Sequence, residues 1–145
     1  MTNPSPSSRP PASVKELKLQ EKNAAQQRQI VSELHSFARD IERCEKTITS
    51  LKAELETINS KHQGRRTTRE DIAYLTDLLG CAKKKLAWEK QMGSLQKRAP
   101  ELIERINRLM NDPQNPPADE TRAEMLEALQ QVQGALERLD QVKVT

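Results

Sequence analysis

The chain has 145 residues, enough for one domain but too few for two independent ones. Hydrophobic residues make up 34% of it and aromatic residues 2%, whereas charged residues reach 31%, which excludes a large globular core and favours elongated helices. Strand signals are missing and no apolar run approaches the roughly 20 residues of a membrane span, so we expect an all-α protein without membrane insertion.

The first 12 residues are rich in proline and serine, which predicts a disordered tail over 1–12. Ser13 followed by Glu16 is a capping-box pattern, with a serine as N-cap and a glutamate three residues later. The pattern therefore predicts that a first helix begins near residue 13.

A single apolar ladder dominates this first helix, and its steps alternate between four and three residues. That heptad spacing keeps all its members on one side of a helix, so the ladder predicts a helix over about 13–59 that packs lengthwise on other helices. The heptad ladder comprises Ile30, Leu34, Phe37, Ile41, Cys44, Ile48, Leu51, Leu55 and Ile58.

The segment 59–67 interrupts the periodicity, with Gly64 in its middle. Thr67 and Glu70 then form a second capping-box pattern, which predicts a second helix over about 68–97. Because so short a break between long helices normally reverses the chain, residues 13–97 are predicted to form a long antiparallel coiled-coil hairpin.

The second helix carries two apolar stripes. The first stripe, at heptad spacing, comprises Ile72, Leu75, Leu79, Ala82 and Leu86. We expect this stripe to face the heptad ladder, with Ile72 beside Ile58 and Leu86 beside Cys44, a register that also brings Glu45 toward Lys83.

The second stripe flanks the first and makes the apolar arc too wide for one neighbouring helix. It contains the only tryptophan of the chain, and tryptophan and methionine are enriched at binding hot spots. Packing inside the protein is the alternative interpretation. The residues predicted to form this partner interface are Tyr74, Leu78, Cys81, Trp88, Met92 and Leu95.

Pro100 is expected to start a third helix, because proline is favoured in a first turn and disrupts a helix interior. This helix would span about 100–111, and a proline-rich loop would separate it from a fourth helix over about 118–143. Residues 98–145 are thus predicted to form a second, shorter helical hairpin.

No residue pattern indicates catalysis, a cofactor or a metal site. His35 and His62 have no partner at ligand spacing, and Cys44 and Cys81 form no Cys-x-x-Cys pair. We interpret both cysteines as reduced, structural thiols, which together with the missing signal peptide favours an intracellular protein of the cytoplasm or nucleus.

Basic residues gather at the turn of the long hairpin, namely Lys61, Arg65, Arg66 and Arg69. Overall, residues 1–99 contain 19 Lys and Arg and 12 Asp and Glu, whereas residues 100–145 contain 5 and 9. The basic tip could solubilise the turn or contact a polyanion, although the lack of nearby aromatic residues disfavours single-stranded nucleic acid.

Three functions are consistent with these patterns. The leading hypothesis is a non-enzymatic coiled-coil subunit or adaptor, a scaffold that joins other helical proteins such as those of the cytoskeleton. One alternative is a module that binds nucleic acid or an acidic filament through the basic tip. The other alternative is a simple homo-oligomeric helical rod.

Overall fold

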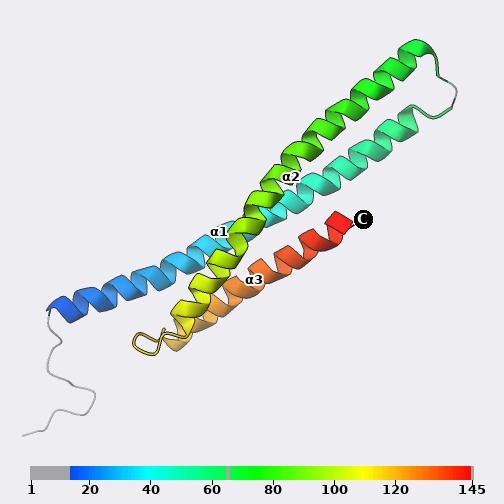
Figure 1. The fold of residues 1–145 in the computed structure, drawn as a ribbon. Helices are drawn as coiled ribbons and strands as arrows, with labels where there is room; N and C mark the ends of the chain where they lie inside the picture. Colours follow the sequence, from blue (N-terminus) through cyan, green and yellow to red (C-terminus); the bar gives the residue numbers. More distant parts are fainter. Residues whose placement is uncertain (1–13, 65, 145) are drawn as a thin grey trace, which may run out of the picture.

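The computed structural model describes residues 14–64 and 66–144, and these residues form three helices without strands. Helices α1 (Val14–Lys61) and α2 (Thr68–Met110) form a long antiparallel hairpin, and α3 (Asp119–Val144) lies alongside (Figure 1). The predicted all-α class and the long helical hairpin are therefore confirmed. The predicted disordered tail 1–12 and Arg65 of the basic tip lie outside the described residues.

The heptad ladder of α1 forms the centre of the core. Eight of its nine members are buried, and those from Ile30 to Cys44 are fully inaccessible to solvent. Helix α1 packs against both other helices, which explains why this part of the ladder is completely covered. The exception is Leu55, which is 41% exposed near the end of α1.

The turn between α1 and α2 follows the predicted capping pattern. The hydroxyl of Thr67 accepts a hydrogen bond from the backbone N–H of Glu70 at 3.2 Å, so Thr67 is the N-cap of α2. Gly64 has a φ of 90°, a backbone conformation that residues with a Cβ rarely adopt. The chain can therefore reverse within a few residues.

The face that α2 presents to α1 differs from the prediction. Trp88 of the second stripe is buried, and its Nε1 donates a hydrogen bond to the carbonyl oxygen of Cys44 at 2.8 Å. Leu86, which was expected beside Cys44, is 56% exposed. The second stripe, not the first, therefore packs on the heptad ladder, and the predicted register of the hairpin is wrong.

The continuity of α2 explains this choice of face. Beyond Leu95 the second stripe continues in heptad spacing through Ala99, Leu102 and Ile106, all of which are buried. The first stripe has no such continuation, because Glu89 occupies its next heptad position. Since α2 is one helix, burying its C-terminal half on this face fixes the same face for its N-terminal half.

The predicted helix break at Pro100 is also wrong, because α2 runs through this proline to Met110. Pro100 lies on the exposed side of the helix, where its ring does not enter the core. It cannot donate a backbone hydrogen bond to the carbonyl of Gln96, but packing of the opposite face outweighs that loss. The expected helix 100–111 is thus the last part of α2.

Replacing Pro100 with alanine should make the protein more stable. The substitution restores the missing backbone hydrogen bond and removes the ring, so the free energy of unfolding should rise by about 1–3 kcal/mol. Urea denaturation followed by circular dichroism measures the change. A lower free energy of unfolding in Pro100→Ala would show that the proline begins a separate helix, as the sequence predicts, rather than lying within a continuous one.

Helix α3 closes the core, and its bounds agree with the predicted last helix. Its buried residues include Met125, Val132 and Leu139. The preceding loop is held by Asp112, whose Oδ1 accepts hydrogen bonds from the backbone N–H groups of Gln114 and Asn115. The end of α2 and all of α3 therefore form the short C-terminal hairpin, although its first helix is not a separate element.

Ion pairs at the surface reflect the same arrangement. Arg138 of α3 lies 3.8 Å from Glu42 and 3.7 Å from Glu45 of α1. The predicted approach of Glu45 to Lys83 is therefore not realised. The neighbouring Lys84 instead pairs with Glu54 at 3.0 Å, which is consistent with the altered register.

Candidate functional site

The hairpin of α1 and α2 extends beyond the end of α3. The side-chain Nζ of Lys52 donates a hydrogen bond to the carbonyl of Val142, which places the end of α3 beside Lys52. The hairpin continues past this point to its turn without a third helix (Figure 1). We call residues 53–61 of α1 and 68–81 of α2 the two-helix arm.

The first stripe is exposed along this arm. Ile72 is 61% exposed, Leu75 63% and Leu79 56%, and Ala82 and Leu86 continue the row on the solvent side. Isolated exposed leucines are common, but a row at heptad spacing is the pattern with which helices pack on one another. The first stripe is therefore an apolar helix face that no described element of the chain covers.

An open apolar groove adjoins the first stripe where α3 ends. It has a volume of about 370 Å³ and lies between α1 and α2. Its walls are largely aliphatic but include two lysines. The lining comprises Ile48, Leu51, Lys52, Leu55, Leu78, Cys81, Ala82 and Lys85. The half-exposed Leu55 of the heptad ladder thus belongs to this groove, and the stripe and the groove form one apolar surface.

The six residues predicted as a partner interface lie on the inner side of α2. Cys81, Trp88, Met92 and Leu95 are buried, whereas Tyr74 and Leu78 are partly buried against the same core. Helix α1 covers most of this second stripe, so the structure favours the alternative interpretation, internal packing, for its buried part; Leu78 and Cys81 also line the open groove. Sequence reasoning did not identify the first stripe as an exposed surface. The end of its heptad pattern at Leu86, while the second stripe continues to Ile106, could have indicated this.

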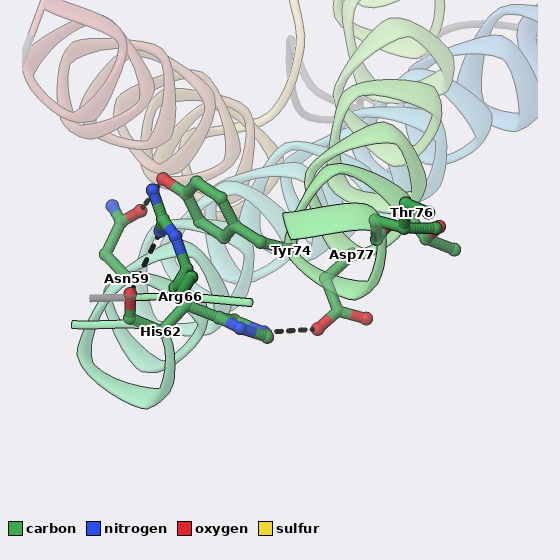
Figure 2. A network of polar contacts seen from close by, with 7 residues as sticks. Asn59, His62, Arg66, Tyr74, Thr76 and Asp77 are labelled. Carbon is green, nitrogen blue, oxygen red and sulfur yellow. Dashed lines mark hydrogen bonds and ion pairs between the residues drawn. The ribbon is translucent and has the colours of Figure 1, made fainter. Parts of the chain in front are cut away.

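The basic tip is organised around Tyr74. Arg66 lies over the ring of Tyr74, 4.3 Å from its centroid, and donates to Oδ1 of Asp71 at 2.9 Å. Tyr74 donates its hydroxyl hydrogen to Oδ1 of Asn59 at 2.7 Å, and Figure 2 shows these side chains converging. Arg66 is therefore held by groups of its own chain, which leaves it less able to bind a polyanion.

His62 joins the turn to α2 in the same network. Its Nε2 lies 3.1 Å from Oδ2 of Asp77, and its ring lies 5.1 Å from that of Tyr74 (Figure 2). Its carbonyl accepts a hydrogen bond from Arg66. Of the other predicted tip residues, Lys61 and Arg69 are exposed. The network thus fastens the turn, and the structure gives it a local structural role.

Both cysteines are free and buried. Burial raises the pKa of the Cys44 thiol above its ordinary value, although a contact with Trp88 acts in the opposite direction. A raised pKa keeps the thiol protonated, and the protonated form is a poor nucleophile and a poor metal ligand. Cys44 therefore acts as a small apolar member of the heptad ladder.

Within residues 14–64 and 66–144, no group of three or more histidine, cysteine, aspartate or glutamate side chains is placed to hold a metal ion. None of the helices in this part of the chain combines the length and apolar character that crossing a bilayer requires. No protein-family model, curated protein or solved structure matches the chain.

Proposed function

We propose that the protein is a non-enzymatic helical subunit or adaptor of a larger protein assembly, which binds a helix of a partner protein through the first stripe. The observation that supports this most is the heptad row on the two-helix arm, whose leucines and isoleucine are more than half exposed. A partner helix laid along the arm would bury this row as α3 buries the neighbouring part of the core.

The proposal differs from the sequence-based hypothesis in the surface that it uses. Most of the second stripe is covered by α1, so the proposed binding face is the first stripe and the groove beside it. The free, buried cysteines suit a reducing compartment, and on that ground we propose the cytoplasm or nucleus as the place of action. Binding of a polyanion at the tip is the weaker alternative, because Arg66 is engaged with Asp71 and Tyr74.

The test removes apolar surface from the first stripe and leaves the core intact. Leu75 and Leu79 are both replaced with serine, and the matched control replaces Leu19 and Leu126, two leucines that are 54% and 42% exposed elsewhere. Chemical crosslinking in cell extract identifies partners of the parent chain. Each partner is then purified, and its affinity is measured for the parent and both variants.

Leu75→Ser with Leu79→Ser should weaken binding of a stoichiometric partner by at least about 100-fold, since each leucine contributes roughly 1.5–3 kcal/mol when it is buried. The Leu19→Ser and Leu126→Ser control should bind as the parent does, and circular dichroism should show equal helix content in all three. If every purified partner binds the serine pair with unchanged affinity, the first stripe is not the docking face.

A further inference from the structure

The exposed residues beside the first stripe are mostly basic. Arg69, Lys83 and Lys90 occupy heptad position e along one edge, and Lys85 occupies position g along the other edge. All four side chains are exposed, and Lys85 also lines the adjoining groove. Positions e and g are the ones that meet a docked helix, so these cations would face whatever covers the stripe.

Two carboxylates lie among them, and one is Glu89, which occupies the d position after Leu86 and lies next to Lys90. The other, Asp71, occupies position g near the start of the stripe, but its Oδ1 already accepts a hydrogen bond from Arg66 at 2.9 Å. Lys84, in contrast, points away from the stripe and pairs with Glu54 of α1. The flanks of the stripe are therefore predominantly positive where a partner helix would lie.

We infer that the helix docked on the first stripe belongs to a different protein and carries acidic residues on both flanks of its own apolar heptads. This inference rests on the proposed function, because it specifies the chemistry of the partner for the same face. Opposite charges at flanking positions select the partner and its orientation, whereas like charges exclude competing helices.

A second copy of this chain fits the stripe poorly. In an antiparallel pair of α2 helices centred near residue 77, Asp71 meets Lys85 of the other copy, but Arg69 meets Lys83. In a parallel pair, Lys85 meets Lys90 of the other copy and no opposite charges compensate. Self-association thus gains nothing from charge. An acidic partner helix meets four exposed cations and two carboxylates, of which Asp71 is already paired with Arg66.

The experiment uses three synthetic peptides of about three heptads with the same leucines and isoleucines at positions a and d. The peptides differ only at positions e and g, which are all Glu, all Gln or all Lys. Each peptide is labelled, checked to be monomeric at the assay concentration, and titrated with the full chain while fluorescence anisotropy is recorded.

The Glu peptide should bind about tenfold more tightly than the Gln peptide, and the Lys peptide should bind least. The preference should shrink as salt is raised, because salt screens exposed charges. Lys83→Glu combined with Lys85→Glu should reverse the order of the Glu and Lys peptides. Leu75→Ser combined with Leu79→Ser should remove binding of all three.

Three results would overturn the inference. If the parent binds the Glu and Gln peptides with equal affinity, and the Leu75→Ser, Leu79→Ser variant binds neither, the acidic partner is refuted. The docking face of the proposed function would still stand. If sedimentation equilibrium shows that the parent is a dimer and that Leu75→Ser is a monomer, the helix docked on the first stripe belongs to a second copy of this chain. If no peptide binds the parent, and the Leu75→Ser, Leu79→Ser variant still binds the purified cellular partners, the proposed function is refuted as well.

Discussion

Leu34→Asp is expected to unfold the protein under conditions in which the parent is folded. Leu34 is fully buried in the part of α1 that packs with both other helices. An unpaired carboxylate there loses its hydration without gaining a partner, which costs several kcal/mol against a total stability of about 5–15 kcal/mol. Circular dichroism and urea denaturation should show little helix or a transition shifted to much lower urea.

Leu55→Asp is the matched control for this substitution. Leu55 belongs to the same heptad ladder, yet it is 41% exposed beside the open groove. A carboxylate at this position can keep its hydration, so the free energy of unfolding should fall by no more than about 1 kcal/mol. Equal damage from both substitutions would mean that the arm is covered by a further element in solution.

Trp88→Ala should be the most destabilising substitution in α2. The indole is 4% exposed and donates its hydrogen bond to the carbonyl of Cys44, so truncation leaves a cavity and removes a contact between the two long helices. Large-to-small changes of this kind cost about 3–5 kcal/mol. Urea denaturation measures the loss, and Trp88→Phe, which keeps an aromatic ring, should lose less.

Leu79→Ala provides the comparison on the opposite face of α2. Leu79 is 56% exposed in the first stripe, and its truncation should change the free energy of unfolding by less than about 1 kcal/mol. The two substitutions therefore separate the observed register from the predicted one. A larger loss for Leu79→Ala than for Trp88→Ala would restore the first stripe as the face that packs on α1.

Much of the fold follows from local signals in the sequence. The heptad ladder from Ile30 to Ile58 is buried except for Leu55, and Thr67 caps α2 as its pattern with Glu70 predicts. These features depend on residues within a few turns of one another, where periodicity and capping are decisive. The extent of α1 and α3 could be predicted for the same reason.

The binding face of α2 could not be predicted in the same way. Its two stripes are both apolar, and the choice between them depends on the continuation of the helix through Pro100 to Met110. The local preference of proline favours a break, whereas the buried row of Ala99, Leu102 and Ile106 favours continuation. Tertiary packing favours the continuous helix over the break. The buried apolar row lies on both sides of Pro100, so a short stretch of sequence on one side does not reveal it.

The contacts of the basic tip could not be predicted from the sequence, for a related reason. Arg66 reads in the sequence as one member of a basic cluster, but its partner Asp71 belongs to the opening turn of the next helix. Charge runs along a sequence do not reveal which cations are neutralised by folding. Only the arrangement around Tyr74 shows that Arg66 is already engaged.

Because α2 is uninterrupted, it also sets the distance between binding sites at its two ends. At about 1.5 Å per residue, a helix bound at Leu79 would lie roughly 45 Å from Met110 at the far end of α2. The three helices pack together toward that end, and the arm projects beyond α3 (Figure 1). Two proteins attached at the arm and at the loop after Met110 would therefore be held at a fixed separation, which a flexible connection at Pro100 would not provide.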